Sequence, residues 1–153
     1  MSPGEPPGHY IVDASVVAKW QSGAEADRDV ALQLREQFLT GTLRLSAPEY
    51  MMVEVIRVLQ LGVRDRRYTA TEGLGLLRGL LRLPILYIAN QHLFEPAFLL
   101  SSDYQMAFYD ALYLAASRLL DVPLITADRR FYNLSQNRGL SDVRWLADEG
   151  SSG

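Results

Sequence analysis

Four acidic residues are the side chains of this sequence best suited to chemistry. Asp13 and Asp128 stand at the ends of short apolar segments that are typical of β-strands. Glu54 and Asp110 lie in helical patterns, with apolar residues three and four positions away along the chain. An ionised carboxylate on a buried helix costs several kcal/mol unless it is paired, hydrogen-bonded or bound to a cation. Four such groups in one place would repel one another, and a divalent cation would relieve that repulsion.

The available ligands limit the metal that this sequence could hold. The chain has no cysteine and only two histidines, so carboxylate oxygens are the main donors. Oxygen donors suit Mg²⁺ or Mn²⁺, which retain bound water and favour phosphate substrates. Such an ion activates a water for attack on phosphorus and offsets charge on the leaving oxygen. The acids therefore predict phosphodiester hydrolysis. Ser15 and Thr126, each two residues from a strand-end aspartate, are expected to orient the acids or a metal-bound water.

Each acid taken alone also has an ordinary structural interpretation. An aspartate after a strand is a common turn residue or helix cap, which would account for Asp13 and Asp128. Asp110 would stabilise its own helix N-terminus through the helix dipole. Arg57 follows Glu54 by three residues, which is the spacing of an ion pair on one helix face. The recurrence of acids at two strand ends and on two apolar helices nevertheless favours a shared site.

Arginines near the acids are candidates for substrate binding. Arg129 and Arg130 follow Asp128 directly, where they could hold phosphates at the mouth of a pocket or simply begin a solvated helix. Arg57 could bind a phosphate or neutralise Glu54. The net charge of −3 provides no general attraction for nucleic acid, but an acidic pocket surrounded by basic residues is compatible with a nuclease.

The elements that must position these residues alternate between strand and helix patterns. Strands are expected at residues 10–12, 43–46, 83–88 and 142–146, helices at 24–40, 48–61, 69–81 and 90–100, and a helix, a turn and a strand within 108–131. Ser15 is expected to cap a helix that begins after Asp13, and Gly62 to end the helix before it. This alternation predicts a mainly parallel sheet covered by helices on both faces. In such a sheet ligands bind outside the carboxyl ends of the strands, where Asp13 and Asp128 are expected to lie.

The size and composition of the chain indicate one domain. A chain of 153 residues with 48% apolar composition can bury one full core but not two ordinary ones. We expect the domain to span residues 9–147, with flexible tails at 1–8 and 148–153 that are rich in Gly, Pro and Ser. The sequence has no apolar run approaching the roughly 18 residues of a membrane helix, and its first residues do not resemble a signal peptide. These features predict a cytoplasmic protein without membrane contact.

Four segments together resemble the PIN-domain proteins of the VapC toxin type. The segments are Ile11 to Trp20, Ala47 to Val55, Tyr109 to Ala115 and Leu124 to Arg130. The resemblance implies a three-layer α/β/α sandwich with a mainly parallel sheet of about five strands. It also implies a ribonuclease site dependent on Mg²⁺ or Mn²⁺, with RNA as the substrate. A homodimer and a small antitoxin partner that blocks the site are further implications.

The functional residues of that family fall on specific positions of this chain. Its acidic quartet, which is implied to be both catalytic and metal-binding, corresponds to Asp13, Glu54, Asp110 and Asp128. Its supporting hydroxyl positions correspond to Ser15 and Thr126. Two positions depart from the family pattern, since Arg57 replaces a common asparagine and Ala107 replaces a common serine.

Two functional hypotheses follow from the resemblance and its departures. The first is a toxin that cleaves RNA. The alternative is a catalytically weak or inactive PIN-fold module that binds RNA or protein, with Arg57 having weakened metal binding. A small-molecule phosphohydrolase is less favoured, because the sequence after Asp13 lacks a second aspartate that could act as an acid beside a phosphorylated first one.

Overall fold

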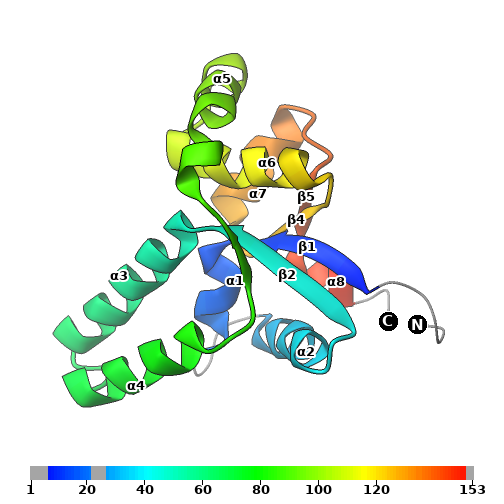
Figure 1. The fold of residues 1–153 in the computed structure, drawn as a ribbon. Coiled ribbons are helices and arrows are strands. Elements are labelled where there is room, and N and C mark those ends of the chain that lie inside the picture. The colour runs from blue at the N-terminus through cyan, green and yellow to red at the C-terminus, as the bar shows by residue number, and fades with distance from the viewer. Residues whose placement is uncertain (1–6, 22–26, 151–153) are drawn as a thin grey trace.

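The fold is built on a five-stranded sheet in which every pairing is parallel. The computed structural model describes residues 7–21 and 27–150. The strands follow the order β3-β2-β1-β4-β5 across the sheet. They are β1 (Gly8–Val12), β2 (Leu43–Pro48), β3 (Leu86–Ile88), β4 (Leu124–Thr126) and β5 (Val143–Trp145). Helices cover both faces of the sheet, so the predicted three-layer α/β/α fold with a parallel sheet is confirmed (Figure 1).

Helices connect the strands and supply the outer layers. They are α1 (Ala14–Lys19), α2 (Arg28–Leu39), α3 (Tyr50–Arg64), α4 (Ala70–Leu81), the 3-10 helix η1 (Asn90–His92), α5 (Phe94–Tyr104), α6 (Phe108–Leu120), α7 (Arg129–Asn137) and α8 (Leu146–Gly150). Residues 111–117 of α6 are all buried, as expected for a helix that is packed on more than one side. Within the described residues, no helix has the length and apolar character needed to cross a membrane.

The central strands bring polar residues from distant parts of the chain together. Strands β1 and β4 pair through Ile11 with Leu124 and through Val12 with Ile125, and all four of these residues are completely buried. Asp13 directly follows β1, and Thr126 is the last residue of β4, so the register places these two polar side chains next to each other. Strands β2 and β3 lie on one side of β1, and strands β4 and β5 lie on the other side. The strand order therefore switches direction between β1 and β4, and such a switch point is where parallel sheets bind ligands.

Several element boundaries differ from the predicted ones. Asp13 rather than Ser15 caps α1, because its carboxylate accepts the amides of Ser15 and Val16. Helix α7 was not among the predicted helices. It buries only Phe131 and Ser135, too few apolar positions to reveal a helical period. Residues 90–100 form a 3-10 turn and a separate α5 rather than one helix.

The ends of the predicted elements also need adjustment. Helix α2 begins at Arg28, and the earlier start predicted at residue 24 lies outside the described residues. Strand β1 already includes Gly8, and α8 continues through residues 148–150, both of which we expected to belong to the tails. The remaining tail residues, 1–6 and 151–153, lie outside the described part of the chain.

Gly62 lies inside α3 instead of ending it. The helix continues to Arg64, and the ring of Tyr68 packs directly against the glycine. A Cβ atom added at position 62 would lie 2.3 Å from the Cζ atom of Tyr68, which is closer than any ordinary contact. The glycine is therefore required by the close approach of the α3–α4 connection and not by a helix end.

Gly62→Ala is expected to destabilise the protein by about 1–3 kcal/mol, because the ring of Tyr68 must shift to accommodate the methyl group. Gly79→Ala in α4 is the matched control, since a Cβ there meets nothing within 4 Å. That control is expected to be neutral or to stabilise by up to ~1 kcal/mol through helix propensity. Urea denaturation of both variants measures the difference, and equal stabilities would contradict this account of the glycine.

Candidate active site

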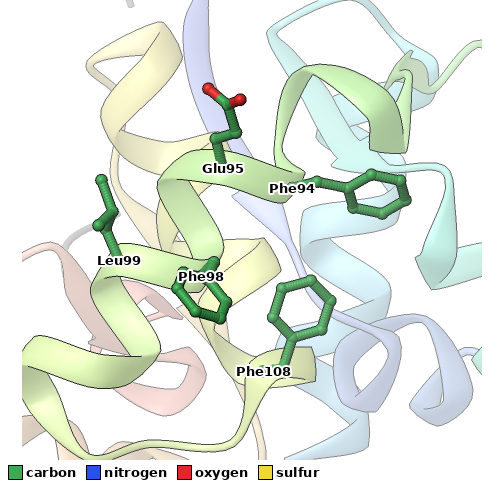
Figure 2. Close-up of a pocket in the computed structure, with 5 residues that line it drawn as sticks. All are labelled: Phe94, Glu95, Phe98, Leu99 and Phe108. Atoms are coloured by element: carbon green, nitrogen blue, oxygen red, sulfur yellow. The ribbon is translucent and has the colours of Figure 1, made fainter.

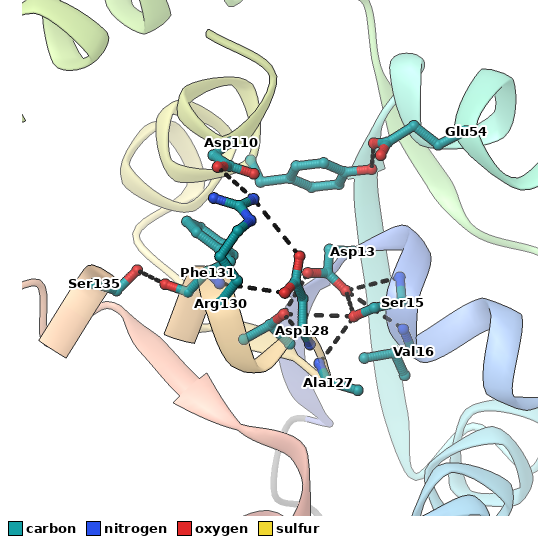
Figure 3. A network of polar contacts seen from close by, with 12 residues as sticks. Asp13, Ser15, Val16, Glu54, Asp110, Ala127, Asp128, Arg130, Phe131 and Ser135 are labelled. Carbon is teal, nitrogen blue, oxygen red and sulfur yellow. Dashed lines mark hydrogen bonds and ion pairs between the residues drawn. The ribbon is translucent and has the colours of Figure 1, made fainter. Parts of the chain in front are cut away.

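All four predicted acids line one cavity. The cavity has a volume of about 440 Å³ and lies beyond the carboxyl ends of β1 and β4. Asp13 follows β1, Asp128 follows β4, Glu54 projects from α3 and Asp110 projects from the first turn of α6 (Figure 3). Four segments that are far apart in the sequence therefore contribute one carboxylate each to the same cavity.

Asp13 is the most constrained of these acids. It is only 6% exposed, and the Oδ1 atom accepts hydrogen bonds from the Ser15 amide at 3.1 Å, the Ser15 hydroxyl and the Val16 amide at 3.4 Å. The Oδ2 atom accepts the hydroxyl of Thr126 at 2.5 Å. Ser15 and Thr126 thus both contact this carboxylate directly, and its orientation is fixed by residues of α1 and β4.

The two hydroxyls also have fixed orientations. Ser15 Oγ accepts the amide of Ala127 at 2.9 Å, and Thr126 Oγ1 accepts the amide of Asp128 at 3.0 Å. Since an amide can only donate, each hydroxyl accepts from the end of β4 and donates its own proton to Asp13. This network joins the ends of β1 and β4 and presents Asp13 as an acceptor.

Burial raises the pKa of Asp13 to about 6. The hydrogen bonds from Ser15 and Thr126 favour the ionised form and oppose this change, while the negative charge of Asp128 adds to it. The hydrogen bonds therefore compensate only part of the cost of burying the charge. A cation in the cavity would favour the ionised carboxylate further.

Glu54 is held by a tyrosine that the sequence analysis did not single out. The hydroxyl of Tyr113 donates a hydrogen bond to Glu54 Oε1, and the Tyr113 side chain is almost completely buried beside the cavity. Burial raises the pKa of Glu54, with the charges of Asp110 and Asp128 adding to the effect. Tyr113 lies three residues after Asp110, on the same helical face, and this spacing was the available signal.

Arg57 lines the cavity but does not form the ion pair that its spacing from Glu54 suggested. Among the described residues, no contact between the two charged groups is within 4.0 Å, although the arginine still lowers the pKa of Glu54 through its charge. The side chain of Arg57 is exposed at the wall formed by α3.

Arg130 lies between two acids of the cavity, and its side chain does not simply begin a solvated helix. Its Nη2 atom is 3.0 Å from Asp110 Oδ2 and 3.7 Å from Asp128 Oδ2 (Figure 3). Burial raises the pKa of Asp110, and the hydrogen bond and charge of Arg130 oppose that change. Arg129 points elsewhere, with its guanidinium 3.8 Å from the centre of the Trp145 ring. The two neighbouring arginines therefore have different environments.

The donor set fits a hard divalent cation in chemistry, but the side chains are not gathered around one point. Within residues 7–21 and 27–150, no three acidic or histidine side chains lie close enough together to hold an ion. Tyr113 holds Glu54, and the Arg130 guanidinium occupies the space between Asp110 and Asp128. The raised pKa values of Asp13, Glu54 and Asp110 show that their ionised forms are poorly compensated. A divalent cation would supply that compensation once Arg130 moved aside.

The fold and the cavity define a class of α/β/α proteins with an acidic site at the switch point of a parallel sheet. The family model for the PIN domain matches residues 10–137. The match includes all four acids and both hydroxyl residues, and this chain belongs to the PIN domain family.

Comparison with solved structures agrees with this assignment. A chain of a toxin–antitoxin complex from Klebsiella pneumoniae is 18% identical, has a TM-score of 0.60 and aligns over 90% of this chain and 97% of its own. PAE2754 from Pyrobaculum aerophilum is 18% identical with a TM-score of 0.66, over 95% and 96% of the two chains. VapC20 from Mycobacterium tuberculosis, described as a sarcin–ricin loop cleaving toxin, is 16% identical with a TM-score of 0.59, over 81% and 93%. At these identities the likeness shows the fold. No curated protein sequence matches the chain significantly.

Proposed function

We propose that this protein is a metal-dependent endoribonuclease that hydrolyses RNA phosphodiester bonds, as the toxin of a type II toxin–antitoxin pair. The observation that carries this proposal is the convergence of Asp13, Glu54, Asp110 and Asp128 on one cavity at the switch point of the sheet. Membership of the PIN family supports the same assignment. The fold of VapC20, which cleaves the sarcin–ricin loop, supports RNA as the substrate.

The four acids would hold Mg²⁺ or Mn²⁺, which when bound activates water and offsets charge on the leaving oxygen. Ser15 and Thr126 orient Asp13 through their hydroxyl protons, and Tyr113 orients Glu54. Arg57 lines the cavity from α3 and would contact a phosphate of the substrate. These residues give the protein a means to bind and orient a phosphodiester beside an activated water.

Arg130 is assigned a competing role in this proposal. Its guanidinium bridges Asp110 and Asp128, so metal binding requires this ion pair to open. The released arginine could then contact the substrate phosphate, as could Arg129 after leaving Trp145. Each arginine thus has a resting contact within the protein and a second contact that RNA would provide.

Arg130→Gln is expected to bind Mn²⁺ about fivefold more tightly than the wild type, because an exposed ion pair is worth up to ~1 kcal/mol. Calorimetric titration of Mn²⁺ without RNA measures this affinity. Arg129→Gln is the matched control, since its guanidinium stacks on Trp145 and leaves the acids alone. Equal or weaker Mn²⁺ binding by Arg130→Gln would exclude competition between the arginine and the metal.

The function itself is tested by incubating the purified protein with single-stranded RNA, single-stranded DNA of the same sequence and a phosphomonoester. Internal cleavage of the RNA alone, abolished by EDTA and restored by Mg²⁺ or Mn²⁺, is the expected result. Release of phosphate from the monoester without RNA cleavage would instead assign the cavity to small substrates.

The partner part of the proposal is a small antitoxin and a second copy of the chain. A relative in fold is part of a toxin–antitoxin complex. Helices α3 and α4 extend together away from the sheet (Figure 1), and a groove of about 530 Å³ runs between them. Leu59, Leu74 and Leu77 line the groove, and it would accommodate an apolar segment of a partner. The proposal also places the protein in the cytoplasm. It places the PIN domain at residues 9–147, with β1 and α8 extending to Gly8 and Gly150 at its two ends.

A PIN module that binds RNA or protein without cutting is the second candidate. The position of Arg130 between two acids and the distribution of the carboxylates favour it. Calorimetry at millimolar Mg²⁺ and Mn²⁺ separates the candidates. An absence of binding of either ion would support the inactive module.

A further inference from the structure

An aromatic row leads from the acidic cavity to the surface of α5. We use this term for Tyr50, Tyr109, Phe108 and Phe94. Tyr50 lines the cavity, and its ring is stacked on Tyr109 with centroids 4.9 Å apart and planes 12° apart. The rings of Phe108 and Tyr109 form a T-shaped pair with centroids 6.3 Å apart, and the ring centroids of Phe94 and Phe108 are 6.4 Å apart. The row is therefore continuous, from a residue of the cavity wall to the outer face of α5.

Much of this row is exposed. Tyr109 is 56% exposed and Phe94 is 50% exposed, which is unusual for rings of this size. At the far end of the row, Phe94 and Phe108 line an open apolar hollow together with Phe98 and Leu99 (Figure 2). Tyr50 and Phe108 also pack against the core, but burial there does not explain the exposed rings of Tyr109 and Phe94.

Tyr109 has the geometry of a stacking platform. The ring is stacked on Tyr50, it packs against Phe108 at an interplanar angle of 66°, and Tyr109 nevertheless remains 56% exposed. The two contacts hold the ring in place, so a flat ligand would not have to immobilise it. Tyr50 is itself fixed at the start of α3, where its amide donates to Asn90 Oδ1 at 3.0 Å.

We propose that the aromatic row binds unpaired bases of a single-stranded RNA, with Tyr109 stacking on a base next to the phosphate in the acidic cavity. This inference rests on the proposed ribonuclease function. Tyr109 directly precedes Asp110, so a base on the ring lies within about one nucleotide of that carboxylate. Paired bases in a duplex cannot reach such a ring, and the proposal therefore assigns single strands and loops as the substrate class.

Continuity with the cavity favours RNA over a protein partner as the occupant. Tyr50 belongs at once to the cavity wall and to the row, and Arg57 adds a positive charge to the same wall. A strand with its phosphate beside Arg57 and Asp110 would pass its neighbouring base over Tyr109. This combination of cationic and stacking groups is the one that binds single strands with little dependence on sequence.

The test measures binding of an oligoadenylate of about twelve nucleotides by fluorescence anisotropy, in EDTA and in an Asp13→Asn background so that no cleavage interferes. Adding Tyr109→Ala is expected to weaken binding about tenfold, whereas Tyr109→Phe should bind within about twofold of the parent. An abasic oligomer of equal length should bind weakly and equally to the parent and to Tyr109→Ala. Leu119→Ala is the matched control, because Leu119 is on the same helix, 57% exposed and far along it from Asp110.

Three results would overturn the inference. They are equal oligoadenylate binding by the parent and Tyr109→Ala, no measurable binding by the parent, and a Tyr109→Ala variant that changes only the sedimentation of the protein. The last result would assign the ring to an interface between copies. Cleavage by the wild type is measured separately, so retained cleavage with Tyr109-independent binding would reject the stacking role and leave the proposed ribonuclease function standing. Absence of cleavage together with binding that depends on Tyr109 would reject the ribonuclease function and retain RNA binding by the aromatic row.

Discussion

Asparagine in place of Asp13 or Asp110 is expected to lower the rate of RNA cleavage by about a thousandfold. A divalent cation contributes several kcal/mol to charge stabilisation in phosphoryl chemistry, and each 1.36 kcal/mol corresponds to a factor of about ten in rate. Asp13 is the only acid of the four that is almost completely buried, and Asp110 lines the same cavity from the first turn of α6. Asparagine keeps one oxygen but removes a negative charge, so either substitution should leave too little negative charge to hold the ion.

The comparison requires a variant that removes an acid elsewhere. Asp103→Asn in α5 changes an exposed aspartate outside the cavity, so it should cleave RNA at the wild-type rate. Cleavage is followed on a labelled RNA under single-turnover conditions, with circular dichroism to verify that each variant is folded. Undiminished cleavage by both Asp13→Asn and Asp110→Asn would remove the acidic cavity from the mechanism.

Asp13→Asn is also expected to make the metal-free protein more stable by about 2 kcal/mol at about pH 8. The pKa of Asp13 is about 6 in the folded protein, against 3.8 for an ordinary aspartate, and this difference corresponds to about 3 kcal/mol. Because the folded pKa is raised, the folded state binds more protons than the unfolded state between these values, and stability falls as pH rises through that window. Asparagine is neutral and escapes this penalty, although it loses one acceptor for the hydroxyls of Ser15 and Thr126.

Urea denaturation in EDTA at several pH values measures this effect. The two proteins should be nearly equal in stability at about pH 4, and the advantage of Asp13→Asn should appear between about pH 4 and pH 6. Mn²⁺ should then stabilise the wild type and not the variant, since only the wild type binds the ion. A variant that is less stable than the wild type at every pH would show that the hydrogen bonds to Asp13 outweigh the cost of burying its charge.

The sequence was sufficient to predict the acidic cavity because the acids occupied positions with few ordinary uses. Asp13 and Asp128 followed apolar segments, and parallel strands bring their carboxyl ends to one edge of the sheet. Glu54 and Asp110 had apolar neighbours at helical spacing, which predicted burial near a core. The strand and helix alternation was equally readable, and the five parallel strands confirm it.

Contacts between distant side chains could not be read from the sequence. The spacing of Glu54 and Arg57 predicted a local ion pair, whereas the fold brings the hydroxyl of Tyr113 to Glu54 from another helix. Arg130 contacts Asp110 across twenty positions of the chain, which no periodic pattern encodes. Gly62 had the sequence signature of a helix end, but its close contact with Tyr68 depends on how α3 and α4 meet. Periodicity predicts elements and their buried faces, and tertiary packing decides the partners.

The Mn²⁺ dependence of RNA cleavage by the purified wild-type protein tests the central claim most directly. We predict no cleavage in EDTA, a rate that rises and saturates with added Mn²⁺, and half-saturation at the Mn²⁺ concentration at which calorimetry shows the site to be half filled. RNA cleavage that persists unchanged in EDTA, or an RNA that stays intact at saturating Mn²⁺, would contradict the assignment of the four carboxylates to a metal-dependent ribonuclease.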